Sequence, residues 1–157
     1  MSDTLKLAKK EYNNADQPTK EILERIFGKE NFKFNWKNID SVIAACDANG
    51  TDSSKIHPYK NPQTAKEEWL NAIAEMEEVV RAINQDWTPD WSNSNQRKWR
   101  PWFEYSSAVS GFRFHYSLYD YSYTISTCGS RLCLETEEKS NYCGRQFIDL
   151  WNKILLK

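Results

Sequence analysis

The chain lacks long hydrophobic runs, and none of its segments approaches the roughly 18 apolar residues that a membrane-spanning helix needs. We therefore expect no membrane partner. Its first residues, MSDTLKLAKKEY, are charged throughout and lack the apolar core, about 7 to 15 residues long, of a secretory signal. These absences favour a cytoplasmic, reducing setting, in which the four cysteines remain thiols.

An excess of charge of one sign is also missing. The 21 lysines and arginines nearly balance the 22 aspartates and glutamates, which leaves a net charge of -1. Proteins that bind polyanions over their whole surface carry a domain-wide basic excess, so a nucleic-acid site in this chain would have to be local.

Signatures of common enzyme classes are absent as well. The sequence contains neither the glycine-rich nucleotide-binding patterns nor the H-E-x-x-H and G-x-S-x-G motifs. Only two histidines are present, and Cys128 and Cys133 have a spacing that structural zinc sites rarely use. We assign no catalytic residue, expect no metal and no cofactor, and favour a non-enzymatic protein.

What the sequence does contain, over its first 84 residues, is helical periodicity. Asp16 and Pro18 predict the start of a second helix, and Gly28 predicts its end. A third helix is expected over about 38–49, and the strongest signal covers about 63–84. In that last segment the apolar residues recur every three or four positions and predict a buried stripe. The stripe consists of Trp69, Ile73, Met76, Val80 and Ile83.

The apolar period changes to two in the later part of the chain. Residues 111–118, 121–127 and 131–135 each alternate, and we expect two-residue turns at Tyr119-Asp120 and Gly129-Ser130. With this register Phe114, Tyr116 and Leu118 fall on one face, which predicts a three-stranded antiparallel meander with its other face in solvent. Residues 101–105 are a candidate fourth strand at the edge.

Residues 136–157 close the chain as a helix with Thr136 or an adjacent residue as its cap and an apolar stripe that would cover the sheet. We therefore predict a single α+β domain, residues 1–157, with N-terminal helices, a three- to four-stranded antiparallel β-meander, and a C-terminal helix packed on the sheet. Its parts are a mainly helical segment 1–84, a Trp-rich connector 85–100, the sheet 101–135 and the helix 136–157.

Four of the seven tryptophans lie in one polar segment, NQDWTPDWSNSNQRKWRPWFEY, residues 84–105. These rings could close the end of a core, anchor a protein partner, or stack on the bases of a single strand. We weigh the structural interpretation first, protein binding second and nucleic acid third. The candidate binding residues are Trp87, Trp91, Arg97, Lys98, Trp99, Arg100 and Trp102.

Three functional hypotheses remain from these residues. The leading one is a non-enzymatic interaction or structural module whose partner is another protein. The first alternative is binding of single-stranded nucleic acid, in which Arg97, Lys98 and Arg100 contact phosphates. The second alternative is an enzyme acting on a sugar or small polar ligand, with Asp86, Asp90 or Glu104 as its acid and base. The sequence leaves the oligomeric state open.

An ordered series of blocks covers most of the chain: RIFGKENF, SVIAACDANG, AINQDWTPDW, KWRPWF and SRLCLETEEKSNYCGRQFIDLW. In these blocks the chain resembles a family of small proteins without known activity, encoded by gut anaerobes and their phages and prophages. The resemblance implies a compact accessory or structural protein linked to phages or mobile elements. It brings no activity, cofactor or catalytic residue.

Overall fold

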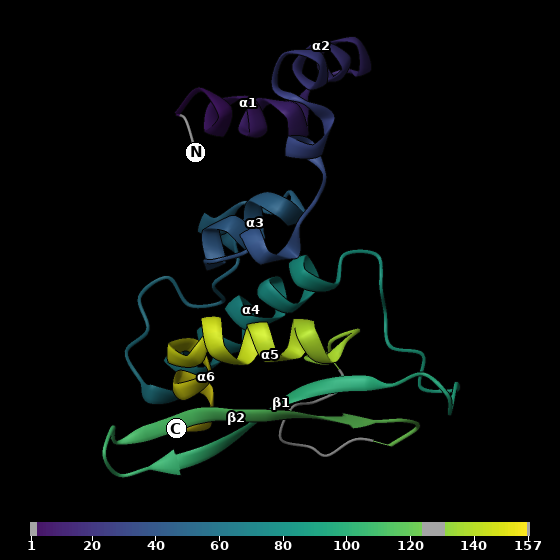
Figure 1. The fold of residues 1–157 in the computed structure, drawn as a ribbon. Helices are drawn as coiled ribbons and strands as arrows, with labels where there is room; N and C mark the ends of the chain where they lie inside the picture. The colour runs from purple at the N-terminus through teal and green to yellow at the C-terminus, as the bar shows by residue number, and fades with distance from the viewer. Residues whose placement is uncertain (1–2, 124–130, 157) are drawn as a thin grey trace. The chain divides into compact units, whose positions relative to one another are not determined.

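The computed structural model describes residues 3–123 and 131–156 (Figure 1). Within these residues the chain has six α-helices and one antiparallel sheet of two strands, which makes it an α+β protein. Two compact units are present, a first unit of Met1–Asn35 and a second unit of Trp36–Lys157. The single-domain organisation stays a prediction.

The first unit is a helical hairpin followed by one 3-10 turn. It contains α1 (Asp3–Asn14), α2 (Gln17–Phe27) and η1 (Lys29–Phe32). The predicted start and end of α2 are confirmed: the Asp16 carboxylate accepts a hydrogen bond from the backbone N–H of Thr19, at 3.1 Å. Gly28, which follows the helix, has a φ of 85°, a conformation that glycine adopts without steric cost.

The second unit begins with short helices and then the long α4. Its first elements are η2 (Trp36–Asn38), α3 (Val42–Asn49), η3 (Ser53–Lys55) and α4 (Ala65–Asn84). Thr64 and Glu67 form a capping box that fixes the start of α4. The predicted stripe on this helix is confirmed in the core for Met76, Val80 and Ile83, which are all buried.

The sheet pairs β1 (Lys98–Ser106) with β2 (Gly111–Asp120). Residues 101–105, expected as an optional edge strand, are thus part of one of the two strands. The predicted turn at Tyr119-Asp120 is wrong, because both residues lie within β2 and pair with β1. The predicted turn at Gly129-Ser130 lies outside the described residues.

A β-bulge divides the hairpin into two halves. Trp102 pairs with Tyr116, but the next residue of β1 pairs with Phe114, so His115 is an extra residue on β2. Side chains alternate between the faces of a strand, and one extra residue reverses that alternation. The prediction that Phe114 shares a face with Tyr116 and Leu118 is therefore wrong.

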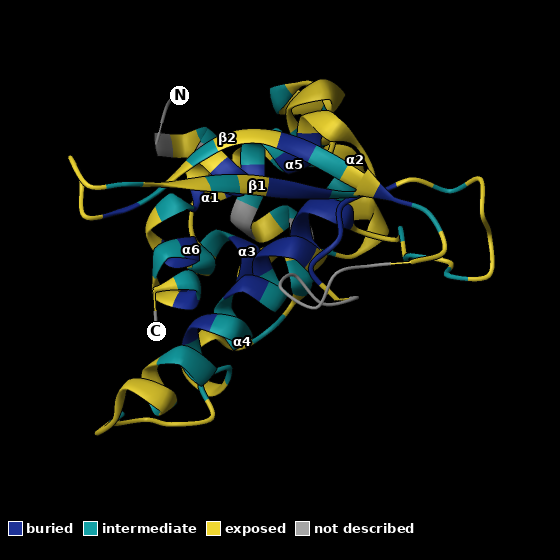
Figure 2. Ribbon diagram, turned by 90° about the horizontal axis from the view of Figure 1, so that it is seen from below, coloured by how far each residue is buried: buried dark blue, intermediate teal, exposed yellow. Residues whose placement is uncertain are grey.

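One face of the hairpin, the helix-covered face, packs on α5 (Glu137–Gln146). The hydroxyl of Ser117 donates a hydrogen bond to that of Ser140, at 2.7 Å, and both residues are buried. Trp102 and Tyr116 lie on the opposite face, the outer face. Figure 2 shows the hairpin from the side of this outer face.

The segment before α5 runs beside β1 rather than in a meander. Trp99 and Leu134 exchange two backbone hydrogen bonds of 2.9 and 2.7 Å, which form an isolated antiparallel bridge. The predicted meander pairs residues 131–135 with residues 121–127, of which 124–127 lie outside the described residues. The segment from Leu132 to Leu134 is buried, as expected for a strand under a helix. It lies at the β1 edge of the hairpin and not at the β2 edge.

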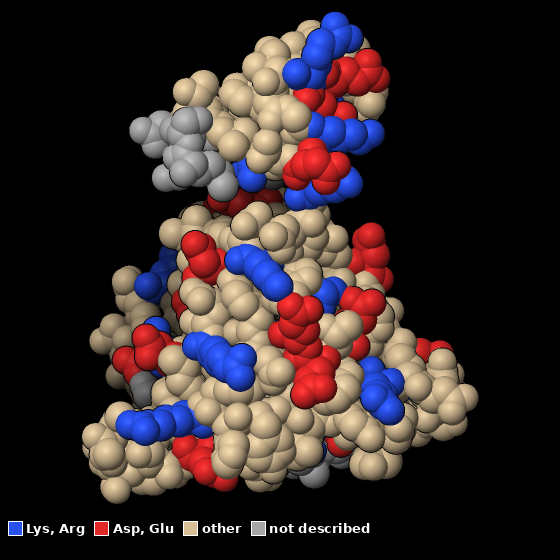
Figure 3. Space-filling model, in the orientation of Figure 1, with Lys and Arg blue, Asp and Glu red and all other residues tan. Residues whose placement is uncertain are grey.

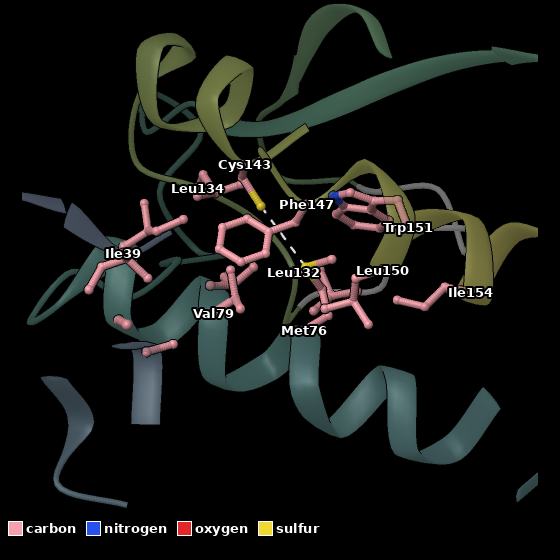
Figure 4. Close-up of a cluster of buried hydrophobic side chains, with 14 of the residues drawn as sticks. Ile39, Met76, Val79, Leu132, Leu134, Cys143, Phe147, Leu150, Trp151 and Ile154 are labelled. Atoms are coloured by element: carbon pink, nitrogen blue, oxygen red, sulfur yellow. Dashed lines mark hydrogen bonds between the residues drawn. The ribbon is translucent and has the colours of Figure 1, made fainter. Parts of the chain in front are cut away.

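The predicted C-terminal helix is two helices, α5 and α6 (Ile148–Leu155), separated at Phe147. The predicted cap is confirmed, since the Thr136 side chain accepts a hydrogen bond from the N–H of Lys139. The break lets α5 lie on the sheet while α6 packs against both α4 and β2. Phe147 and Trp151 are buried with Met76 in one core cluster (Figure 4). Among the described residues, no helix is both long and apolar enough to cross a bilayer.

Asparagine side chains fasten loops and strands to the helices. The Asn152 amide on α6 accepts from the N–H of Phe112 at 2.7 Å and donates to its carbonyl at 3.1 Å. On α4, Asn71 makes the same two contacts with the backbone of Tyr59, at 3.1 and 2.8 Å. Each amide thus satisfies one backbone donor and one backbone acceptor.

Replacing Asn84 by alanine is expected to lower the free energy of unfolding by about 1–2 kcal/mol. The buried Asn84 amide donates to the Cys133 carbonyl at 2.7 Å and accepts from the Glu135 N–H at 3.1 Å, so the alanine variant loses two hydrogen bonds inside the protein. Urea denaturation followed by circular dichroism measures the change. The exposed Asn95 provides the matched control, and Asn95→Ala should change stability by less than about 0.5 kcal/mol. Equal midpoints for the two variants would contradict this assignment.

Candidate interaction surface

The Trp-rich segment begins as a loop between α4 and β1. Its Asp90 carboxylate accepts from the N–H and the hydroxyl of Ser92, at 2.9 and 2.6 Å, and these hydrogen bonds lower the pKa of Asp90. Such a turn accounts for the aspartate without catalysis. Trp87 and Trp91 in this loop are half-buried.

Lys98, the first residue of β1, is fully buried. Its ammonium donates to the carbonyls of Asn93 and Gln96, at 3.1 and 2.9 Å, and lies 5.3 Å from the centre of the Trp91 ring. Carbonyl oxygens and an aromatic face both stabilise a cation that is removed from water. The lysine therefore holds the loop on the strand, and its charge is directed inward.

Arg100 is buried too, and it forms an ion pair with Asp120 on the neighbouring strand. The guanidinium Nε donates to the carboxylate at 3.0 Å, and the two side chains are 7% and 5% exposed. The Trp102 ring lies 5.8 Å from the guanidinium carbon. Among the three cations assigned to nucleic-acid binding, Lys98 and Arg100 thus have partners within the fold.

Arg97 is exposed and stacks on Tyr119 of β2, with 4.6 Å between the guanidinium carbon and the ring centre. Its contact with Tyr121 lowers the pKa of that phenol, because the guanidinium stabilises the phenolate form. Trp99 packs edge-on against the same Tyr119 ring, at 4.9 Å, and is half-buried.

The outer face carries an exposed aromatic cluster of Trp102, Tyr116 and His115. The Trp102 and Tyr116 rings stack with their centres 6.3 Å apart, and they are 37% and 42% exposed. His115 packs edge-on against Tyr116 at 4.9 Å, and its Nδ1 lies 2.8 Å from the Glu104 carboxylate. Of these three residues, the sequence predicted only Trp102 as a binding residue, because Tyr116 had been placed on the core face.

The carboxylates of the enzyme hypothesis lie in separate settings. Asp90 is engaged in its own turn, whereas Glu104 contacts His115 on the hairpin. Glu104 lines a cavity of about 550 Å³ at the hairpin end, and neither Asp86 nor Asp90 is among the residues that line it. Glu104 is therefore not paired with either aspartate as general acid and base at this cavity.

A second pair of polar side chains joins His57 to Glu75 of α4. The Nε2 atom of His57 is 2.6 Å from the Glu75 carboxylate, beside a cavity of about 260 Å³ that Lys153 also lines. A carboxylate can orient an imidazole for proton transfer, but the residues lining this cavity include no serine, threonine or cysteine that could act as a nucleophile.

Metal ligands do not gather in the part of the chain that the structure describes: no three His, Cys, Asp or Glu side chains there could hold an ion. Cys46, Cys133 and Cys143 are buried thiols. Burial raises the pKa of the Cys46 thiol, which keeps it protonated.

Comparisons with protein-family models, curated proteins and solved structures found no match to this chain.

Proposed function

We propose that the protein is a non-enzymatic interaction module that binds another protein through the outer face of its hairpin. The observation that carries the proposal is the pair of stacked, exposed rings of Trp102 and Tyr116 on the face that α5 does not cover. Tryptophan and tyrosine are the residues that most often dominate the energy of protein interfaces. A phage or mobile-element setting, which the family resemblance implies, belongs to the same proposal.

The charge distribution supports a protein partner over a nucleic acid. Basic and acidic side chains are interspersed over the visible face of the second unit (Figure 3). Lys98 and Arg100 direct their charges to groups within the fold. Binding to a phosphate backbone needs several unpaired cations along one groove, and the contacts of these two residues weigh against such a groove here.

The variant Trp102→Ala,Tyr116→Ala is expected to lose its partner while keeping its fold. In affinity capture from a bacterial lysate, followed by mass spectrometry, the wild-type chain should retain a defined protein. The variant should retain at most about a tenth of that amount. The captured protein is then purified, and its binary affinity for both chains is measured by calorimetry.

The matched control is Tyr59→Ala, which removes an aromatic ring of similar exposure, 39%, from a loop outside the hairpin. This control should capture the partner as the wild type does. Capture that is equal in all three chains would remove the outer face from the proposal. A 12-nucleotide single strand is titrated in parallel, and salt-sensitive binding of that strand would favour the nucleic-acid alternative instead.

A further inference from the structure

The two outer edges of the hairpin differ in how many of their backbone groups are hydrogen-bonded. On the β1 edge, Trp99 is paired with Leu134, and Pro101, two residues further on, has no N–H to offer. On the β2 edge, the Asn152 amide occupies the N–H and carbonyl of Phe112. These contacts close all of the β1 edge as far as Pro101, but only the beginning of the β2 edge.

The remainder of the β2 edge, the open edge, has no hydrogen-bonded neighbour among the described residues. In an antiparallel pair, backbone groups point alternately towards the partner strand and away from it. The outward contacts of Phe112 fix this alternation, and with the bulge counted it leaves Phe114, Ser117 and Tyr119 with outward N–H and carbonyl groups. Within residues 3–123 and 131–156, no other segment forms a hydrogen bond with them. Such a row of backbone groups is a template for another extended chain.

Exposed arginines lie at both ends of this open edge. Arg145 of α5 stacks on the Phe114 ring, with its guanidinium carbon 4.8 Å from the ring centre, and Arg97 stacks on Tyr119 at 4.6 Å. Neither guanidinium forms an ion pair with a carboxylate of the described residues, whereas Arg100 and Arg131 do. The stretch between the two rings is about five residues of strand, or about 17 Å.

We propose that the open edge of β2 binds an extended acidic segment of the partner protein, which adds a third strand to the sheet. This inference rests on the proposed function and deepens it. Backbone hydrogen bonds to Phe114, Ser117 and Tyr119 hold the segment, as in other cases of strand addition. Carboxylates near its two ends pair with Arg97 and Arg145, and side chains on one of its faces lie beside Tyr116 of the aromatic cluster.

An array of immobilised nine-residue peptides of random sequence, probed with the purified full chain, tests the proposal. The bound peptides are expected to be enriched in strand-forming residues at their centres and in aspartate or glutamate near their ends. The best binder is then measured by fluorescence anisotropy. Two versions of this peptide are then N-methylated at alternate residues, one at the odd and one at the even positions. The version in which methylation blocks the hydrogen bonds to β2 should bind about tenfold more weakly or worse, and the other version should lose much less affinity.

Variants of the chain test the charge component. Arg97→Ala and Arg145→Ala should each weaken binding of that peptide about three- to fivefold, as expected for solvent-exposed ion pairs. The control is Arg131→Ala, which removes an exposed arginine that pairs with Glu77 on α4 and should leave the affinity unchanged.

Each contrary result has a distinct meaning. No bound peptide, no acidic enrichment, or equal binding by both N-methylated forms would overturn strand addition, while capture of a protein through Trp102 would still support the proposed function. A dimer in sedimentation equilibrium that the peptide dissociates would assign the open edge to a second copy of the chain and also overturn the inference.

Discussion

Replacing Asp120 by alanine is expected to lower the free energy of unfolding by about 3–5 kcal/mol, the range measured when one partner of a buried ion pair is removed. The Arg100 guanidinium would stay buried on the outer face without the carboxylate that accepts its Nε–H at 3.0 Å. Desolvation of an unpaired cation is far more costly than the loss of an ordinary hydrogen bond. Urea denaturation of the purified variant, with the wild type in parallel, measures the change.

Two further variants separate the ion pair from simple loss of volume. Arg100→Met,Asp120→Leu removes both charges and should recover most of the lost stability, because apolar replacements for a buried pair are often neutral. Glu104→Ala removes a carboxylate from the exposed contact with His115 and should cost less than about 0.5 kcal/mol. A double variant as unstable as Asp120→Ala would show that the charge on Arg100 is not the cause.

Replacing Gly144 by alanine should lower the free energy of unfolding by about 3 kcal/mol, a large effect for one added methyl group. A Cβ at this position would overlap Cδ2 of Phe114 and lie 2.8 Å from Cβ of Pro101, where α5 crosses the sheet. Alanine favours a helix by about 1 kcal/mol over glycine, so intrinsic propensity alone predicts the opposite sign. The thermal and urea midpoints of the variant decide between the two.

The ring that causes the clash can be shortened. In Gly144→Ala,Phe114→Leu the branched side chain leaves room for the new methyl group, so the double variant should lose less stability than the sum of the two single changes. Additive losses would mean that the contact with Phe114 does not cause the effect. Phe114→Leu alone provides the reference value for the shortened ring.

The helical half of the fold could be predicted because its signals are local. A cap such as Asp16 and the stripe ending at Ile83 depend only on residues a few positions apart, and those residues do meet in the structure. The break at Phe147 was missed because the apolar period continues through it, from Cys143 to Trp151.

The pairing of the strands could not be predicted to the same extent, because the residues that pair lie far apart in the sequence. β1 begins with Lys98 and contains Arg100, and cations are normally read as surface residues. Only the fold brings Asp120 and the loop carbonyls close enough to bury them. The alternation near Leu134 did signal a strand-like segment, but alternation does not say which edge such a segment joins.

The candidate surface was found only in part. Trp102 was predicted because tryptophan in a polar segment is conspicuous, whereas Tyr116 was assigned to the core by its alternation with Phe114. An extra residue such as His115 has no particular residue type that would mark it, so nothing in the sequence indicates that the alternation reverses there.

Because of the bulge, the hairpin is more sensitive to the number of residues in β2 than to their identity. Removing His115 would shift the alternation of the strand by one residue. Trp102 could then stay paired with Tyr116 only if the side chains on the other side of the bulge moved to the opposite face of the hairpin. A substitution at the same place would change one side chain and leave the rest in position. Insertions and deletions in β2, more than point changes, are therefore the steps by which a protein of this design would exchange its outer face for a buried one.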